Sequence, residues 1–389
     1  MHTYYGDLHI HIGQARGRPV KITASRDLSL HKILYRDAPA KGLHLVGIVD
    51  AGSTLVSSEI ARMLEKGLIQ ELPGGGFQAN NGVLMITGCE IETRERVHVI
   101  AYLPTWQALQ QWQAYVKSRV QNQELSTQKV QMDLGEVMDL CQELDGIFCP
   151  AHVFTPHKGI YGAYTRRLES VFGVQYREIQ VLELGLSSDT DMADTIKETS
   201  HFTFLSNSDA HSAINIGREY NRLRMQEANF SELRLCLQHR QGRAVEGNYG
   251  LHPLLGKYYR SYCKACDTIL DGEAVYRSCP YCNNTSIVMG VYDRIKELQD
   301  TRHSVHPPGR PPYYYRVPLS WLPGFGPVTC QRLLENYSEI DIIEELDIDI
   351  IRQKLPERLA NVIEDMRQNR LTIIPGGGGR YGRVKTNHR

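Results

Sequence analysis

Short apolar segments alternate with amphipathic segments through the first 245 residues of the chain. Each apolar segment has the length of one strand, and the segments between them space apolar residues as a helix does. This alternation predicts an α/β fold whose strands are parallel. The predicted strands cover residues 1–12, 43–50, 83–90, 97–101, 146–152, 179–184 and 202–208, and the clearest predicted helices cover residues 57–66, 134–144 and 230–238.

The first predicted strand carries polar residues at alternate positions. Asp7, His9 and His11 share one face of an extended strand, and the apolar Leu8 and Ile10 lie behind them. Two imidazoles on one strand face are suitable ligands for Zn, Mn or Fe. Taken alone, the pair is equally well explained as two surface histidines on an edge strand.

Ligand-type side chains recur where the later apolar strands end. In a parallel barrel, the carboxyl ends of the strands gather at the face that holds the active site. A single histidine at a strand end is usually a core or surface residue, but the recurrence favours a site for several metal ions. The candidate metal ligands are His9, His11, Asp50, Glu90, His98, His152, Asp209 and His211.

These motifs, in this order, resemble those of the PHP family of phosphoesterases. The resemblance covers roughly residues 1–245 and implies a distorted seven-stranded barrel, of the (β/α)7 type, that binds three metal ions. The motifs that carry it are Asp-Leu-His-Ile-His at 7–11, Gly-Cys-Glu at 88–90, His98, Pro-Ala-His at 150–152 and Ser-Asp-Ala-His at 208–211.

The resemblance also implies how the ligands are divided among the ions. One ion would lie among His9, His11, Glu90 and Asp209, and Glu90 would bridge to a second ion held by His98 and His152. His211 would serve a third ion. Many PHP members have a ligand histidine directly after the aspartate of the second strand, where this chain has Ala51. A third ion would therefore need Asp50 or another group, or would bind weakly.

Glu183, at the end of a later predicted strand, has two interpretations of similar weight. It either orients a ligand imidazole from behind or is a plain buried carboxylate at a strand end.

Four cysteines form two Cys-x-x-Cys pairs within residues 246–300: Cys263, Cys266, Cys279 and Cys282. Two such pairs at this spacing predict one tetrahedral, structural zinc ion and a small zinc-binding module. Disulfides would require an oxidising compartment. A module of this kind often contacts DNA, although it can also simply support neighbouring domains.

Residues 301–389 form a third predicted region, which is mainly helical. It begins with a Pro- and Arg-rich linker whose residues Tyr313–Tyr315 either stack on bases or, more simply, pack on the barrel. A turn containing Gly324 and Gly326 then precedes a helix over 328–337, and a second helix covers 355–369. The turn resembles a helix-hairpin-helix DNA-binding motif, whose backbone N–H groups suit a phosphate. A basic, glycine-rich tail follows.

Overall composition excludes few partners, because the net charge is zero and the sequence pI is about 7.2. Local charge is more informative: residues 14–36 contain six Arg or Lys and one acid, and the last twenty residues contain five and none. Such segments favour phosphate partners. No apolar run is long enough to span a bilayer, and the chain opens directly on a patterned strand, so we expect a cytoplasmic protein with no membrane contact.

The order of a PHP-like barrel, a four-cysteine module and a helix-hairpin-helix-like region resembles the endonuclease Q family over nearly the full length. The stretch 150–162 and the missing histidine after Asp50 are also similar to that family. The resemblance implies a DNA repair endonuclease that cuts 5′ of uracil, hypoxanthine, xanthine or an abasic site and leaves a 3′-hydroxyl and a 5′-phosphate. Damaged double- or single-stranded DNA would be its partner. A replication clamp is a further candidate partner, although no clear clamp-binding peptide is visible.

On this interpretation the barrel holds two to three divalent ions (Zn, Mn, Fe or Mg), and Glu90, Asp209 and His211 are the catalytic candidates. Clustered ions activate water and neutralise phosphate oxygens. Arg26 is either a phosphate clamp or a solvated charge. The other candidate substrate contacts are His157, Lys158, Phe154, Tyr161, Gly324 and Gly326, with Phe154 and Tyr161 as walls of a pocket for a flipped base, although packing is the more ordinary role of either ring.

Two alternatives belong to other functional classes. A small-molecule phosphatase of the histidinol-phosphate type would share the metal site but would need neither the cysteine module nor the basic tail. A non-catalytic DNA-binding module with a vestigial metal site gains some support from Ala51, but the otherwise complete ligand set argues against it.

Overall fold

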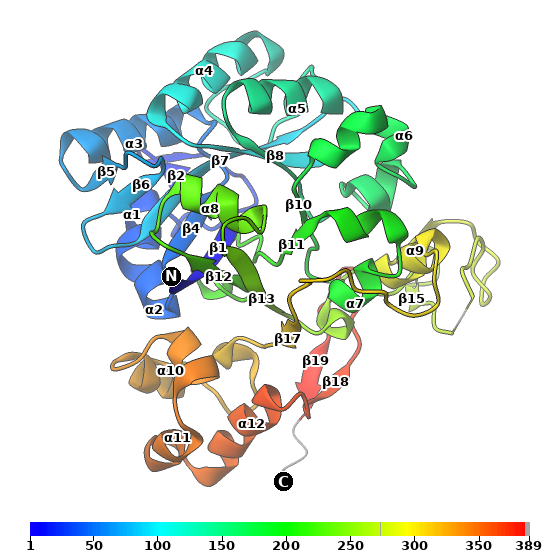
Figure 1. The fold of residues 1–389 in the computed structure, drawn as a ribbon. Coiled ribbons are helices and arrows are strands. Elements are labelled where there is room, and N and C mark those ends of the chain that lie inside the picture. The colour runs from blue at the N-terminus through cyan, green and yellow to red at the C-terminus, as the bar shows by residue number, and fades with distance from the viewer. Residues whose placement is uncertain (273, 386–389) are drawn as a thin grey trace.

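The computed structural model describes residues 1–272 and 274–385, and its first part is a barrel of strands surrounded by helices (Figure 1). The predicted α/β fold is confirmed. The strands of the barrel are β1 (His2–Ile10), β4 (Leu45–Ile48), β7 (Leu84–Glu92), β8 (His98–Leu103), β9 (Ile147–Pro150), β10 (Val181–Glu183) and β11 (Thr203–Leu205). The longer helices that cover it are α3 (Thr54–Glu65), α4 (Trp106–Val116), α5 (Leu134–Glu143) and α8 (Phe230–Leu237).

The alternation predicted that all strands would be parallel, and this prediction is wrong for part of the sheet. β1, β4 and β7 are parallel neighbours, but β7, β8 and β9 pair antiparallel. Only five residues, 93–97, join β7 to β8, and a connection that short permits a hairpin but no crossover. His98 therefore stands at the start of β8 rather than at a strand end. The reversal still brings it to the ligand face, because it pairs in register with Glu92 at the end of β7.

The main sheet continues beyond β1 through β12 (Tyr220–Met225) and β13 (Ala244–Gly250). The predicted barrel boundary at residue 245 therefore falls inside a strand, because β13 remains paired with β12 as far as Tyr249. The linker adds a further strand, β17 (Tyr313–Tyr315), which runs parallel to β13. Tyr314 stacks on Tyr249 with 4.7 Å between ring centroids, so this tyrosine packs against the barrel.

Short elements complete the barrel region. They are β2 (Gln14–Ala15), β3 (Arg18–Pro19), α1 (Leu30–Lys32), α2 (Ala38–Lys41), β5 (Ile69–Glu71), β6 (Phe77–Ala79), α6 (Glu169–Phe172) and α7 (Thr190–Ala193). Local sequence explains where the longer helices begin. Asp133 and Glu136 form a capping box before α5, and the Ser53 side chain caps α3.

The cysteine module consists of β14 (Tyr262–Cys263), β15 (Thr268–Ile269) and β16 (Ile287–Val288), which form a three-stranded sheet. Helix α9 (Val291–Leu298) follows and buries Val291, Ile295 and Leu298 in the main core of the barrel. The module therefore projects from the side of the barrel on a firmly packed helix (Figure 1).

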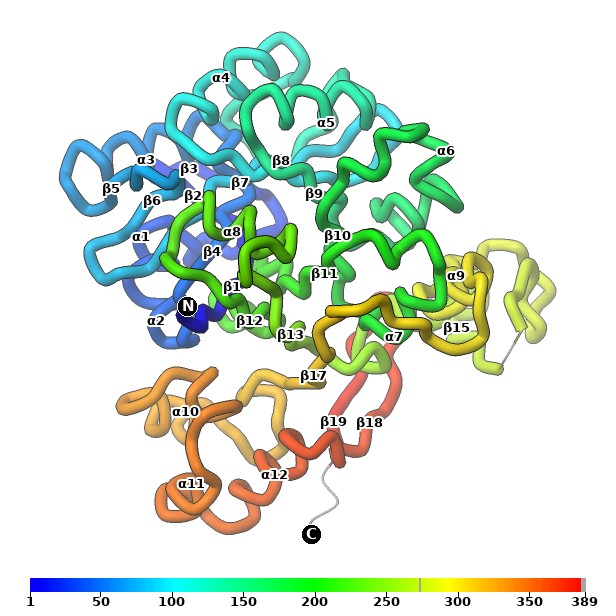
Figure 2. The backbone as a smooth tube through the Cα atoms, viewed as in Figure 1, coloured from blue at the N-terminus to red at the C-terminus, as the bar shows by residue number. Residues whose placement is uncertain are grey.

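The C-terminal helices form a separate lobe with its own apolar core (Figures 1 and 2). They are α10 (Pro327–Leu334), α11 (Ile348–Lys354) and α12 (Glu357–Arg367), followed by a hairpin of β18 (Thr372–Ile374) and β19 (Arg383–Lys385). The helices predicted over 328–337 and 355–369 correspond to α10 and α12. Buried ion pairs of Arg316 with Glu344 and of Lys41 with Glu339 anchor the lobe. Within the described residues, no helix has the length and apolar character needed to cross a membrane.

A buried carboxyl group at the start of β12 makes stability depend on pH. Glu219 is fully buried, and one of its oxygens accepts from Leu251 N at 3.0 Å. Burial raises its pKa from 4.5 to about 8. Between these values the unfolded chain has lost a proton that the folded protein keeps. Stability therefore falls as pH rises through this window, by at most about 1.4 kcal/mol per pH unit.

We expect Glu219→Gln to flatten this dependence, because the amide has the shape of the protonated acid and does not ionise. The measurement is the free energy of urea unfolding at pH 5, 7 and 8. The control is Glu65→Gln, at an exposed position at the end of α3. Equal pH slopes for Glu219→Gln and the unmodified chain would show that the Glu219 carboxyl group ionises normally.

Candidate active site

His9, in β1, and His11, directly after it, direct one nitrogen each toward a common point. His9 Nε2 and His11 Nε2 lie 3.3 Å apart. Their other nitrogens are held from behind, His9 Nδ1 by Glu183 at 2.9 Å and His11 Nδ1 by Asp50 at 2.9 Å. A carboxylate on Nδ1 fixes the ring and leaves the Nε2 lone pair free for a metal ion.

Glu90, near the end of β7, lies between two groups of imidazoles. Its Oε1 is 3.1 Å from His98 Nδ1 and 3.6 Å from His152 Nε2. Its Oε2 is 3.5 Å from His11 Nε2. The side chain is 1 % exposed, so a charged carboxylate here requires nearby positive charge.

The loop after β11 brings Asp209 and His211 to the same place. Asp209 Oδ1 lies 3.5 Å from His9 Nε2 and 3.3 Å from His11 Nε2. The rings of His11 and His211 are 4.4 Å apart. Asp209 has a φ of +46°, a left-handed conformation that a non-glycine residue adopts only when its surroundings enforce it.

Two neighbours of Ser208 enforce this conformation. The Ser208 N–H and hydroxyl donate to the buried Asp7 carboxylate at 3.1 and 2.5 Å. Arg218 donates from Nε and Nη2 to the Ser208 carbonyl at 3.1 and 2.8 Å, and from Nη1 to the Tyr381 hydroxyl at 3.1 Å. The ligand loop is therefore held by the first strand and, through Arg218, by the C-terminal tail.

The donor atoms fit metal ions. Besides the cysteines, three groups in the described chain have donor atoms within 4.8 Å of one another: His9, His11 and Glu90; Glu90, His98 and His152; and His11, Asp209 and His211. His11 Nε2 belongs to the first and third groups, and one nitrogen lone pair binds one ion, so those two groups are alternatives. Two of the groups share the carboxylate of Glu90, and the chemistry of all these donors suits Zn, Mn or Fe.

The electrostatics also favour bound cations. Burial alone would lower the pKa of His9, but Glu183 and Asp209 outweigh it and raise the pKa to about 10. The pocket thus stabilises positive charge at His9, which either a proton or a metal ion supplies.

Most predicted ligands come together, but Asp50 stands apart. Its Oδ1 pairs with His11 Nδ1, and its Oδ2 accepts from Ile12 N at 2.6 Å. Asp50 therefore orients His11, and within the described residues it belongs to none of the groups of donor atoms that lie within 4.8 Å of one another. Glu183 orients His9 in the same way.

Two residues of the site were not predicted from the sequence. Lys21 places Nζ 3.2 Å from Glu90 Oε2 and 2.6 Å from Thr127 Oγ1, and the Thr127 hydroxyl is 2.7 Å from the same carboxylate oxygen. Both residues lie in loops, which lack the regular alternation of side chains that shows, in a strand or helix, which residues point inward. The only signal was the position of Lys21 in the basic segment 14–36.

The predicted base-pocket walls Phe154 and Tyr161 are wrong. Both side chains are at most 1 % exposed and stack on each other at 5.5 Å, so neither reaches an open pocket. The Tyr161 hydroxyl donates to Glu198 at 2.6 Å. The spacing of residues along the sequence does not show whether an aromatic side chain packs in the core or lines a pocket.

The remaining predicted substrate contacts lie on the surface or close to it. His157 is exposed, and Lys158 pairs with Glu92 at 2.5 Å beside the candidate ligand His98. Arg26 is exposed and follows Ser25, whose N–H donates to the His211 carbonyl at 2.8 Å. Gly324 and Gly326 are exposed immediately before α10.

The four cysteines gather around one point. Their sulfur atoms lie within 4.8 Å of one another, with 3.7 Å between Cys263 and Cys282 and 3.6 Å between Cys266 and Cys279. These separations are too long for a disulfide and match the edges of a tetrahedral thiolate site for zinc.

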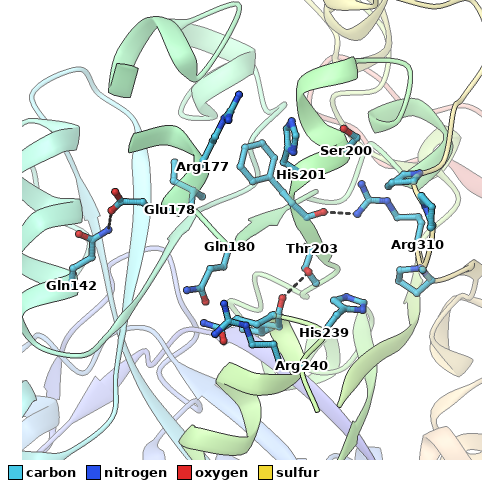
Figure 3. A pocket seen from close by; sticks show the side chains of 18 residues that line it. Gln142, Arg177, Glu178, Gln180, Ser200, His201, Thr203, His239, Arg240 and Arg310 are labelled. Atoms are coloured by element: carbon cyan, nitrogen blue, oxygen red, sulfur yellow. Dashed lines mark hydrogen bonds between the residues drawn. The ribbon is translucent and has the colours of Figure 1, made fainter. Parts of the chain in front are cut away.

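A large basin of about 790 Å³ lies at the other end of the barrel, where β10 and β11 begin (Figure 3). Gln180 and Thr203 contribute to its floor, and the linker closes one side through Arg310, which forms an ion pair with the buried Asp194. None of the candidate metal-binding groups found in the described residues lies in this basin. It is therefore separate from the candidate active site.

We expect Glu183→Gln to weaken metal binding by 10- to 100-fold, because the amide orients His9 but no longer makes its ring more basic. Calorimetric titration with Mn²⁺ measures the affinity. Glu178→Gln is the matched control, since Glu178 is exposed and its carboxylate accepts a hydrogen bond from Gln142 at 2.9 Å. Unchanged Mn²⁺ affinity in Glu183→Gln would exclude this role.

We expect Cys282→Ala to lose one zinc ion per chain and to lower the melting temperature of the module, because zinc binding and local folding are coupled. Atomic emission measures the zinc content. Cys330→Ala, outside the cluster, should keep the zinc. A variant of Cys282 that retains all its zinc would contradict the four-thiolate site.

Comparison with known proteins assigns the chain to a family. No protein-family model matches it. The uncharacterised protein YqxK of Bacillus subtilis is 38% identical over 99% of this chain and 100% of its own length. An uncharacterised protein of Methanocaldococcus jannaschii is 35% identical over 59% of this chain and 31% of its own length.

Two solved structures extend the match to the whole fold. The lesion-specific endonuclease PfuEndoQ from Pyrococcus furiosus is 34% identical, with a TM-score of 0.85 over 100% of this chain and 96% of that one. An endonuclease Q bound to a 27-mer duplex with an abasic lesion at its active site is also 34% identical, with a TM-score of 0.86 over 100% and 97%. With this identity over nearly the full length of both proteins, the chain belongs to the endonuclease Q family.

Proposed function

We propose that this protein is a metal-dependent DNA repair endonuclease. It cleaves the phosphodiester 5′ of deaminated bases (uracil, hypoxanthine, xanthine) and of abasic sites, and it leaves a 3′-hydroxyl and a 5′-phosphate. The observation that carries the proposal is the pair of imidazole groups bridged by Glu90, in a chain that matches an endonuclease Q bound to lesion-containing duplex.

On this proposal the ions are held by His9, His11 and Asp209 on one side of Glu90 and by His98 and His152 on the other. Bound ions of this kind lower the pKa of water and neutralise phosphate oxygens. The protein contributes fixed geometry: Glu183 and Asp50 hold two imidazoles, and Asp7 and Arg218 hold the loop of Asp209. Asp209 is 31 % exposed and forms the open side of the centre, where a phosphate would enter.

A pocket of about 230 Å³ beside this centre has the properties of a site for a flipped base. It begins at His157, next to Lys158, whose carbonyl accepts from the backbone of His98. It is lined by Pro156, His157, Tyr258, Arg260, Tyr262, Lys264, Val288, Met289, Gly378 and Gly379. Rings suit a base, and cationic donors suit the carbonyl oxygen that replaces an amino group on deamination.

The remaining parts supply contacts to the DNA backbone on this proposal. Gly324 and Gly326 lead into α10, which begins with Pro327 and has no side-chain cap, so the N–H groups of Val328 and Thr329 are available to a phosphate. The tail adds the exposed Arg380 and Arg383.

On this proposal the chain has three parts: the barrel to residue 250, the zinc module to residue 300 and the C-terminal region beyond it.

We expect one cut immediately 5′ of the lesion in end-labelled duplexes that carry uracil, hypoxanthine or an abasic site, with Mn²⁺ or Mg²⁺ present. An undamaged duplex should stay intact. Asp209→Ala should lose at least 100-fold in rate, since it removes a ligand from the open side of the centre.

The same assay separates the alternatives. Hydrolysis of a small phosphate ester without any cut in the lesion duplexes would favour a phosphatase. Binding of lesion DNA without hydrolysis of either substrate, together with no metal beyond the module zinc, would favour a non-catalytic module.

A further inference from the structure

Lys21 reaches the centre of the metal site from the loop that follows β1. The small hairpin of β2 and β3 turns the chain back, so that Val20 N donates to Gly13 O at 3.1 Å and Lys21 N donates to Ile12 O at 3.3 Å. Ser126 N donates to Val20 O at 3.2 Å from a second loop. The lysine backbone is thus fixed beside the end of β1, and its side chain is only 13 % exposed.

The ammonium group has a built pocket. Nζ lies 2.6 Å from Thr127 Oγ1 and 3.2 Å from Glu90 Oε2. The Thr127 hydroxyl, 2.7 Å from the same Glu90 oxygen, donates to the carboxylate and accepts from the ammonium group. Each polar atom of this triangle therefore has a partner of the correct type. These contacts satisfy the buried ammonium group and hold it against the Glu90 carboxylate.

The charges around the centre leave a role for one more cation. Four carboxylates are either candidate ligands or hold the ring of a candidate ligand histidine: Glu90, Asp209, Asp50 and Glu183. Two divalent ions would neutralise these four charges. A phosphodiester brings a further negative charge, and more develops as the leaving oxygen departs. Lys21 is the ammonium group that contacts Glu90, the carboxylate placed between the two groups of imidazoles.

The donor set also explains why a protein cation would serve here. His11 has a single nitrogen to offer, because Asp50 occupies the other. The position after Asp50 is Ala51, which is fully buried and has no donor side chain. The ligands available for a third ion beside His11 and Glu90 are therefore poor, whereas the ammonium group needs no such ligands.

We propose that Lys21 is the fixed third cation of the metal centre, which positions Glu90 between the two ions and supplies positive charge that balances the incoming phosphate. This inference rests on the proposed function for the part that concerns phosphate. The part that concerns metal ions rests on the contacts of Lys21 alone.

The test compares Lys21→Met with Lys32→Met in the full-length protein. Lys32 lies further along the same chain segment, is 42 % exposed and pairs with Asp27, so the control removes the same charge away from the centre. The first readout is Mn²⁺ affinity by calorimetry together with metal content. We expect Lys21→Met to bind Mn²⁺ at least about fivefold more tightly or to take up an additional ion, because a neighbouring positive charge no longer repels the ions.

The second readout is cleavage of an abasic duplex. We expect kcat to fall by about 100-fold in Lys21→Met, with KM for the duplex changed less than threefold, since the lost charge acts mainly on the transition state. Tighter metal binding combined with slower cleavage is a pattern that loss of folding does not produce. Lys21→Arg, which keeps the charge, should retain the Mn²⁺ affinity of the unmodified protein.

Weaker or unchanged Mn²⁺ binding in Lys21→Met, or an equal shift in Lys21→Arg, would overturn the proposal. A parallel change in Lys32→Met would do the same. If the unmodified protein cuts no lesion duplex, the proposed endonuclease function fails, while the Mn²⁺ titrations still decide whether Lys21 acts as the third cation.

Discussion

The buried carboxylate of Glu90 is the constraint on which the site depends. Its side chain is 1 % exposed, and a charge at this depth is stable only with close positive partners and hydrogen bonds. Lys21 and the imidazole of His98 hold the pKa of this carboxyl well below its ordinary value, although burial opposes them. The barrel therefore has to bring β1, β7, β8 and two loops to one point, and its mixed strand directions achieve this.

Further carboxylates behind the candidate ligands hold those ligands in position. Glu183 holds the outer nitrogen of His9, Asp50 holds that of His11, and Asp7 holds the loop before Asp209. Each of these groups is buried, so its hydrogen bonds are also what allows it to remain inside the protein. The alternate positions of β1 thus serve two purposes, because two of them are ligand candidates and Asp7 supports the opposite loop.

The sequence predicted those parts of the site that follow a strand period. His9 and His11 share a face because side chains alternate along a strand, and Glu90, His152 and Asp209 lie at or just after strand ends. Lys21 and Thr127 were missed because loop conformation has no period. The sequence predicted the correct face of the sheet for His98 but for the wrong reason. His98 lies at that face because β8 forms an antiparallel hairpin with β7, and not because it ends a parallel strand. The prediction that Phe154 and Tyr161 line a pocket was wrong because the burial of a side chain depends on the whole fold.

The tail is connected to the candidate catalytic loop by contacts across more than 160 residues of sequence. Backbone N–H groups of Gly376 and Gly382 donate to Leu254 and Leu255, which places Tyr381 against Trp321 and the guanidinium group of Arg218. That guanidinium group donates twice to the carbonyl of Ser208, directly before the left-handed Asp209. Displacement of the tail would leave the buried Arg218 with one partner fewer, beside the strained candidate ligand Asp209. The surface proposed to contact DNA and the geometry of the metal centre are therefore parts of one hydrogen-bonded structure.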